Sequence, residues 1–137
     1  MANCEPKNSS ESARALKGKT VLVVEDEEIL RGMAVCILED CGHRVLTAAN
    51  SDEAKEVWEA IGPKLDLVVM DIIIPGLNGL ELAKSFRAAR PELKIMFMTG
   101  SIDRSPEIAA LGGATDALFK PYAPKLLGVK VKEFLGS

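Results

Sequence analysis

Four short segments of this 137-residue chain carry side chains that could take part in phosphoryl or metal chemistry. Asp71 is flanked on both sides by apolar residues. A buried, unpaired carboxylate costs several kcal/mol, so Asp71 needs either a partner or a function. The acidic residues Glu25 and Asp26 follow a Val-rich segment, and Thr99 and Lys120 each follow a further apolar segment. This recurrence indicates that the apolar segments position the polar groups.

If these side chains converge, they suit a magnesium-dependent phosphoryl acceptor. Clustered carboxylates repel one another, and Mg²⁺ offsets this repulsion by taking one or two of them as ligands while leaving room for a phosphate oxygen. The ammonium of Lys120 is suited to binding phosphate, and the Thr99 hydroxyl can donate a hydrogen bond to another oxygen. In such surroundings a carboxylate can attack a phosphoryl group, because its neighbours stabilise the charge on the transferring oxygens.

Each residue has a simpler interpretation when it is taken alone. Glu27 and Glu28 are interpreted as residues of a first helical turn, where acidic side chains favour the helix dipole. Asp71 could cap a turn, Thr99 could be a turn residue and Lys120 could be a solvated loop end. The combination favours a site, because independent loop chemistry would have to place acids, hydroxyl and amine on one edge by chance.

The apolar pattern predicts five strands that alternate with five helices. The strands are expected at residues 20–24, 44–48, 66–70, 94–98 and 116–119. After each strand, apolar residues recur at helical spacing, with a short helix at 106–111 and a last one at 125–135. Asn50 with Glu53 three residues on resembles a capping box, and Gly42 stands where a left-handed helix cap is expected.

This alternation predicts an α/β fold with a five-stranded parallel sheet in the order 2-1-3-4-5 and five helices on both faces, a flavodoxin-like doubly wound domain. Ligands of such sheets bind at the carboxyl ends of the first and third strands, where the strand order reverses. Glu25 and Asp26 follow the first strand and Asp71 follows the third. We therefore expect them to converge, with Thr99 and Lys120 on the same edge.

Composition predicts one soluble domain, residues 19–137, after a flexible, Ser-rich N-terminal tail, residues 1–18. A net charge of −3 and a pI of about 5.3 disfavour nucleic acid as a partner. No apolar run approaches the roughly 18 residues of a membrane helix, and the N-terminus lacks the apolar core of a signal peptide, so the prediction is a cytoplasmic protein with no membrane partner. The only histidine, His43, is expected to be a solvated turn residue rather than a metal ligand.

The segments VLVVEDE (21–27), MDIIIPGLNG (70–79), MTG (98–100) and FKPY (119–122) together resemble the receiver domain of two-component response regulators. The resemblance covers about residues 19–135. A single piece such as KP would carry no weight, but the combination in this order and spacing is specific.

The resemblance implies a role for each matching residue. Asp71 corresponds to the aspartate that accepts phosphate from a histidine kinase or a phosphotransfer protein. Glu25 and Asp26 correspond to the acidic pair that holds Mg²⁺, Asp26 directly and Glu25 through water, together with Asp71. The backbone carbonyl of Ile73 corresponds to a further metal ligand. The phosphoryl group is then met by a switch hydroxyl, at Thr99, and by a lysine, at Lys120.

Two positions depart from or refine the family pattern. Many receivers carry Tyr or Phe three residues before the lysine, and here Ala117 stands there, with its neighbours Leu118 and Phe119 expected on other faces. In receivers the position of Ile73 borders the path of the hydrolytic water, and an aliphatic side chain cannot orient that water by hydrogen bonding, so the resemblance predicts slower self-dephosphorylation than in an Ile73→Asn variant.

The resemblance implies a single-domain response regulator that is a phosphoacceptor and not an enzyme, working as a monomer or weak homodimer on a downstream protein target. No segment remains for a DNA-binding module, although the chain could also be the receiver portion of a hybrid histidine kinase. A haloacid dehalogenase-type phosphatase would need a second aspartate where Ile73 stands. A flavoprotein of this strand order would need a phosphate loop where the acidic run 25–28 stands. The sequence names no cognate kinase, signal or output partner.

Overall fold

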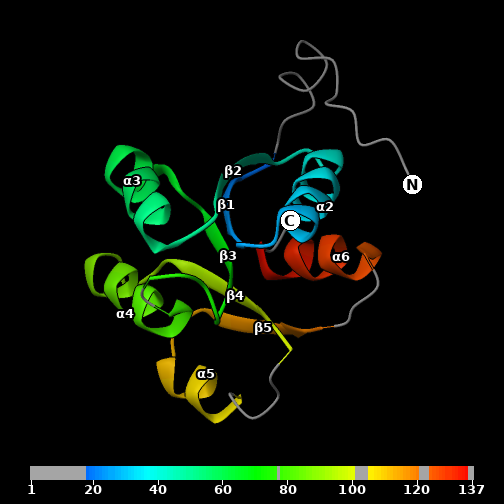
Figure 1. Ribbon diagram of the computed structural model, residues 1–137. Helices are drawn as coiled ribbons and strands as arrows, with labels where there is room; N and C mark the ends of the chain where they lie inside the picture. Colours follow the sequence, from blue (N-terminus) through cyan, green and yellow to red (C-terminus); the bar gives the residue numbers. More distant parts are fainter. Residues whose placement is uncertain (1–17, 77, 101–104, 121–123, 136–137) are drawn as a thin grey trace.

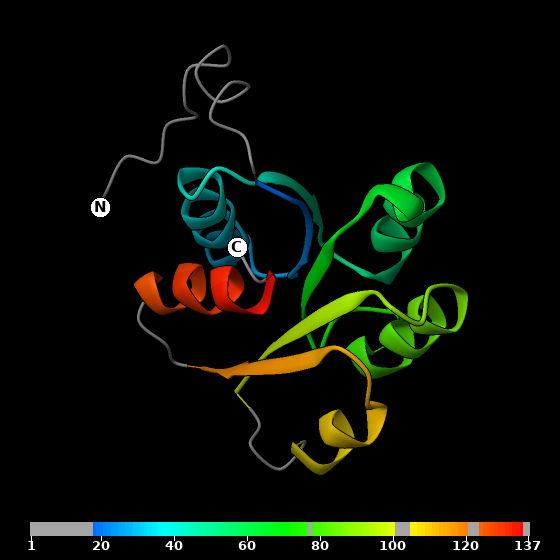
Figure 2. The same cartoon turned by 180° about the vertical axis from the view of Figure 1, so that it is seen from behind.

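The computed structural model describes residues 18–76, 78–100, 105–120 and 124–135, so the predicted tail lies outside the described residues except for Gly18. Figure 1 shows a central twisted sheet with helices on both of its faces. Turning the molecule by 180° in Figure 2 shows the same layering from behind. No helix among the described residues is long and apolar enough to cross a membrane.

The sheet has five parallel strands in the order β2-β1-β3-β4-β5, as predicted. The strands are β1 (Thr20–Val24), β2 (Arg44–Ala48), β3 (Leu67–Asp71), β4 (Lys94–Thr99) and β5 (Thr115–Phe119). β3 and β4 each run one residue further than the apolar pattern predicts, so Asp71 and Thr99 are the last residues of their strands rather than the first residues after them.

Two helices cover one face of the sheet and three cover the other (Figures 1 and 2). They are α2 (Glu28–Asp40), α3 (Ser51–Ile61), α4 (Gly79–Ala89), α5 (Ser105–Leu111) and α6 (Pro124–Leu135), with a short 3₁₀ turn at Gly62–Lys64. α2 and α6 pack on one side, while α3, α4 and α5 pack on the other. The predicted doubly wound fold is confirmed.

The core consists of two apolar layers that the strands separate. Leu22 of β1 and Val68 of β3 belong to the layer under α3 and α4, whereas Val23 and Val69 belong to the layer under α2 and α6. All four side chains are fully buried. Because neighbouring residues of a strand point to opposite faces, a strand covered on both faces must be continuously apolar. The polar residues of these segments are therefore confined to the strand ends.

Asparagine side chains begin two of the helices. Asn50 Oδ1 accepts a hydrogen bond from the Glu53 amide at 2.8 Å, and Glu53 Oε1 accepts one from the Ala49 amide at 2.7 Å. The predicted capping box therefore forms, with the returning bond one residue earlier than in the standard motif. Asn78 caps α4 in the same way by accepting from the Glu81 amide at 2.9 Å. Gly42 adopts φ +95° after α2, as its predicted cap role requires.

The expectation for His43 is wrong, because this side chain is buried and not solvated. Its Nδ1 accepts a hydrogen bond from the Lys19 amide at 3.0 Å. Burial lowers the pKa of His43, although the nearby Asp66 carboxylate opposes that shift. The turn is polar in sequence, but its imidazole folds inward to satisfy the backbone that enters β1.

Candidate functional site

The carboxylates of Glu25, Asp26 and Asp71 converge at the carboxyl ends of β1 and β3. One carboxylate oxygen from each residue lies within 4.8 Å of the other two. The two strands are direct neighbours in the sheet, with Val24 paired to Met70, so the residue after each pair stands at the same edge. The sequence predicted this juxtaposition from strand order alone.

Glu25 is the buried member of the cluster. Its backbone amide donates to the Ala48 carbonyl at 3.0 Å, and its Oε2 accepts from the Glu27 amide at 3.1 Å. Burial raises the pKa of Glu25, and the Glu27 amide and the Lys120 ammonium only partly offset this effect. A positive charge placed beside such a carboxylate stabilises its charged form and opposes the rise in its pKa.

Both oxygens of Asp71 accept hydrogen bonds. Oδ1 accepts from the Ile73 amide at 3.1 Å, and Oδ2 accepts from the Lys120 ammonium at 2.8 Å. The Asp71 side chain retains 13% exposure, so it can be reached from solvent. Asp71 is thus oriented by its own loop and by a cation, and one side of the carboxylate stays accessible.

Lys120 bridges two of the three carboxylates, with its Nζ 3.0 Å from Glu25 Oε1 and 2.8 Å from Asp71 Oδ2. Burial of Lys120 disfavours its charge, but the hydrogen bonds to Asp71 and Glu25 outweigh burial and raise its pKa. The Lys120 amide also donates to the Thr99 carbonyl at 2.7 Å. The end of β5 is therefore tied to the end of β4 beside the carboxylates.

Thr99 lies at the end of β4 with its side chain buried. Its neighbour Met98 is paired with Asp71 across the sheet, and Thr99 itself is paired with Phe119. The hydroxyl therefore belongs to the same edge as the carboxylates, as predicted.

The expectation that Leu118 and Phe119 both lie on other faces than Ala117 is wrong for Phe119. Leu118 belongs to the core layer under α2 and α6, whereas Ala117 packs against the opposite layer. Phe119 is two residues beyond Ala117, and the period of a strand is two, so it shares the face of Ala117. Its side chain is 37% exposed beside Thr99.

A tight loop follows Asp71 and is anchored at several points. Ile72 and Ile74 are buried, whereas the side chain of Ile73 between them is exposed. The Gly79 amide donates to the Ile72 carbonyl at 2.6 Å. A Cβ at Gly79 would lie 2.2 Å from the Asp71 carbonyl oxygen, so only glycine permits this close approach.

The cluster has a formal charge imbalance of three carboxylates against one ammonium. The atoms that could bind a metal ion are all hard carboxylate oxygens, and the exposed Asp26 leaves one side of the cluster open to solvent. Mg²⁺ favours such a site, because it binds through one or two carboxylates and keeps several waters. The residues present therefore fit a magnesium ion, with Glu25, Asp26 and Asp71 as the side chains that would hold it.

Arg31 was not predicted as a site residue, yet it contacts the backbone of the acidic turn. Its Nη1 donates to the Glu25 carbonyl at 2.8 Å and to the Asp26 carbonyl at 3.3 Å. The available signal in sequence is its position on the first turns of α2, close enough to reach back to the strand end.

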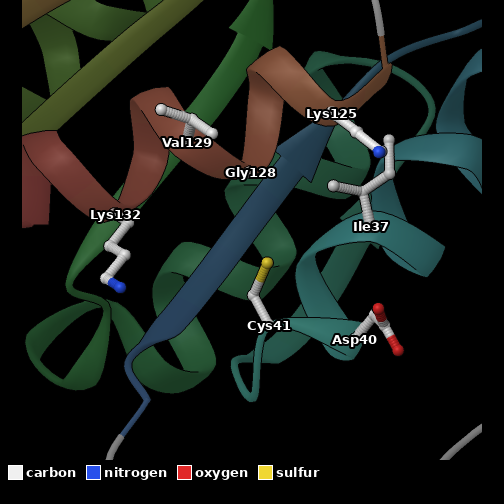
Figure 3. A pocket seen from close by; sticks show the side chains of 7 residues that line it. All are labelled: Ile37, Asp40, Cys41, Lys125, Gly128, Val129 and Lys132. Carbon is white, nitrogen blue, oxygen red and sulfur yellow. The ribbon is translucent and has the colours of Figure 1, made fainter.

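A separate groove of about 370 Å³ lies between α2 and α6, away from the carboxylates (Figure 3). Apolar atoms form most of its lining, and Lys125, Lys132 and Asp40 stand at its margins. A Cβ at Gly128 would lie 3.1 Å from Cys41 Sγ, so this glycine allows the two helices to approach. The groove contains no residue of the carboxylate cluster.

The family model of the response regulator receiver domain matches residues 21–132, and the chain belongs to this family. Such domains are signalling phosphoacceptors. Sensor kinase CckA of Brucella abortus (strain 2308) is 36% identical over 130 residues, which are 91% of this chain and 13% of that kinase. The phosphate regulon regulatory protein PhoB of Pseudomonas aeruginosa is 36% identical over 123 residues, which are 86% of this chain and 52% of PhoB.

Solved structures agree with this assignment. Chemotaxis response regulator CheY4 of Vibrio cholerae superposes with a TM-score of 0.76 at 28% identity, covering 86% of this chain and 99% of that one. The receiver domain of the hybrid histidine kinase CckA superposes with a TM-score of 0.71 at 32% identity, covering 85% of this chain and 98% of that one. This chain spans about half or less of the length of the curated relatives cited above.

Proposed function

We propose that this chain is a receiver that accepts a phosphoryl group on Asp71 and passes the signal on by a change of conformation. The donor is a histidine kinase or a histidine phosphotransfer protein. The single observation that carries the proposal is the convergence of the three carboxylates with Lys120 at the carboxyl edge of the sheet.

In the proposed reaction, a lone pair on an Asp71 carboxylate oxygen attacks phosphorus as the bond from phosphorus to the donor's imidazole nitrogen breaks. The electron pair of that bond stays on the imidazole, which then takes a proton. Glu25, Asp26, Asp71 and the Ile73 carbonyl would hold Mg²⁺. When bound, the ion would neutralise negative charge on the transferring oxygens. Lys120 supplies a second positive charge on the same edge, 2.8 Å from Asp71 Oδ2.

Phosphorylation also changes the balance of contacts around Lys120. In the unphosphorylated chain the Lys120 ammonium bridges Asp71 and Glu25. A phosphoryl group on Asp71 would offer this ammonium new acceptor oxygens. We infer that Thr99 turns its hydroxyl toward the same oxygens, which moves the ends of β4 and β5 together because the Lys120 amide is bonded to the Thr99 carbonyl. The change in these loops biases a two-state equilibrium that a partner reads.

The chain is further proposed to act in the cytoplasm as a domain of residues 19–137 after a tail of residues 1–18. Its partners would be proteins, with no nucleic acid or membrane contact, and its state a monomer or weak homodimer. It would show only self-phosphorylation and self-dephosphorylation chemistry. The comparisons fit a single-domain regulator and also the receiver of a longer protein; the likeness to CckA supports a hybrid kinase, and the likeness to PhoB supports a transcriptional regulator.

The aliphatic side chain of Ile73 disfavours a phosphatase of the haloacid dehalogenase type. That chemistry needs an acidic side chain two residues after the nucleophile, and here an exposed aliphatic side chain occupies the position. Measuring phosphomonoester turnover would reveal such an activity.

The proposal is tested by incubating the purified chain with acetyl phosphate, with and without Mg²⁺. The wild-type chain should become labelled only with the metal present. Asp26→Asn, which removes an exposed ligand without touching Asp71, should reduce labelling strongly, and Asp52→Asn, an exposed acid of α3, should leave it unchanged. Labelling that is equally efficient in EDTA would overturn the proposed role of the cluster.

A further inference from the structure

The turn between β1 and α2 carries two of the proposed metal ligands and is held in an unusual way. α3 and α4 each begin with an asparagine whose side chain caps the helix. α2 begins after Glu27, whose side chain makes no capping hydrogen bond. The turn that carries Glu25 and Asp26 therefore lacks the side-chain cap that fixes the starts of α3 and α4.

Arg31 provides a different anchor for this turn. Its Nη1 donates to the carbonyls of Glu25 and Asp26 at 2.8 and 3.3 Å, and its backbone amide donates to the Glu27 carbonyl at 2.8 Å. The guanidinium thus binds the carbonyls of two consecutive turn residues, and the bond to the Glu27 carbonyl is the ordinary first hydrogen bond of the helix. A hydrogen bond from a charged donor is worth more than a neutral one, so the guanidinium is an effective clamp.

Fixing these carbonyls also fixes where the carboxylates point. The carbonyl direction sets the backbone dihedrals of the turn, and those dihedrals set the Cα–Cβ directions of Glu25 and Asp26. One oxygen from each of the three carboxylates lies within 4.8 Å of the others. The single ammonium of Lys120 binds Glu25 and Asp71 and offsets only part of the repulsion, so an unanchored turn would relax by moving the carboxylates apart.

We propose that Arg31 is a positioning residue for the divalent cation: it holds the acidic turn so that the Glu25 and Asp26 carboxylates stay together before the metal arrives. This inference rests on the proposed function of the cluster as a metal site. Arg31 contacts carbonyls and not the metal-binding oxygens, so it acts on the ligands through the backbone that carries them.

The sign of the mutational effect separates positioning from simple electrostatics. Arg31 places a positive charge beside the site, and a positive charge by itself weakens the binding of a cation. If charge alone mattered, Arg31→Gln would therefore bind Mg²⁺ more tightly, and Arg31→Lys would bind it as the wild-type chain does. If Arg31 positions the turn, both variants bind Mg²⁺ more weakly.

The test is a titration of the ¹⁵N-labelled chain with MgCl₂ at constant ionic strength, following the amide resonances of Glu27 and Ile73. Wild type, Arg31→Gln, Arg31→Lys and the control Arg44→Gln are compared. Arg44 is an exposed arginine at the start of β2, the opposite end of the sheet, so its variant removes the same charge without touching the turn. We expect about tenfold weaker binding for both Arg31 variants, the lower end of what outer contacts of metal sites contribute, and unchanged binding for the control.

A second readout needs no metal. In EDTA, the Glu27 amide, which donates to Glu25 Oε2 in the intact turn, should exchange with deuterium faster in Arg31→Gln than in wild type, while the amides of β3 exchange equally slowly in both. Equal or tighter Mg²⁺ binding by Arg31→Gln, or an unchanged Glu27 amide, would overturn the inference. Failure of the wild-type chain to bind Mg²⁺ would instead overturn the proposed function.

Discussion

Both ends of the sheet contain charged and buried polar groups, but the partners of these groups differ between the two ends. We call the edge with Glu25, Asp26, Asp71 and Lys120 the carboxyl rim. The opposite edge, where the strands begin, is the amino rim, with Thr20, His43, Asp66 and Arg90 as its polar groups.

At the amino rim, the side chains of Asp66, Arg90 and His43 bind backbone groups. Asp66 Oδ2 accepts from the Thr20 amide at 2.9 Å, and the Asp66 amide donates to the Thr20 carbonyl at 2.8 Å. Arg90 Nη1 donates to the carbonyls of Gly62 and Leu65, each at 2.6 Å. His43 accepts from the Lys19 amide. These groups connect loops to strands.

At the carboxyl rim, the side chains contact one another and their charges do not balance. The Lys120 ammonium forms ion pairs with both Glu25 and Asp71, and Asp26 is exposed to solvent. Buried charges that are incompletely compensated cost stability and are found where a protein binds or reacts. The amino rim thus uses its polar side chains to fix the backbone, whereas the carboxyl rim gathers three carboxylates against one ammonium, an excess of negative charge that a cation would offset.

The largest expected effect is on stability, at the amino rim. Arg90→Ala removes the shared donor of two buried carbonyls and should lower the free energy of unfolding by about 3 kcal/mol. Urea denaturation measures the change, and the increase in stability on adding Mg²⁺ should be the same as in wild type. A variant that loses the response to Mg²⁺ would show that the two rims are coupled.

Glu25→Gln should have the opposite effect at the carboxyl rim. Because the pKa of Glu25 is raised above 4.5, its favourable contribution to stability is present below 4.5 and is lost as the pH rises through the folded pKa. At neutral pH the charged side chain therefore costs stability, and the glutamine variant should be more stable without metal by roughly 1 kcal/mol, the usual scale of such replacements. It should also lose most of the stabilisation by Mg²⁺. Denaturation in EDTA and in MgCl₂ tests both points, and a less stable variant in EDTA would contradict the distinction between the rims.

Ile73→Asn tests the open side of the carboxyl rim. The exposed side chain of Ile73 lies two residues after the proposed phosphoacceptor, and an amide there can orient a water molecule that an aliphatic group cannot. The aspartyl phosphate should decay several times faster in the variant, measured by loss of label after removal of the donor. Ile73→Leu serves as the control, and equal decay in all three chains would refute the role of this position.

The smallest effect is a pH dependence at the amino rim. The pKa of His43 lies below 6.5 in the folded chain, so the unfolded state binds more protons and the contribution of neutral His43 is complete above about 6.5. It is lost as the pH falls from 6.5 through the folded pKa. The loss should be about 1 kcal/mol, one buried hydrogen bond, by urea denaturation. In His43→Asn, whose amide oxygen can accept the same bond, this part of the pH dependence should disappear; if it stays, another group titrates.

The sequence predicted the carboxyl rim well because its position follows from strand order. Val-rich strands that are buried on both faces leave polar residues only at their ends, and a parallel sheet brings those ends to one edge. Asp71 and Thr99 could thus be placed without coordinates, apart from a one-residue error in where β3 and β4 end.

What the sequence did not predict depends on contacts that no local pattern encodes. His43 sits in a polar turn, and only the path of the chain at Lys19 makes its burial favourable. The bonds of Arg31 depend on carbonyl directions in an irregular turn.

The central claim, that Asp71 is the chemical centre of the carboxyl rim, is tested most directly by locating the phosphoryl group. The chain is phosphorylated with acetyl phosphate and Mg²⁺, the acyl phosphate is trapped by borohydride reduction, and the peptides are sequenced by mass spectrometry. We expect homoserine at position 71 alone in wild type, and no reduced residue in Asp71→Asn or in EDTA. Reduction at Glu25 or Asp26 instead, or a modification that persists in Asp71→Asn, would contradict it.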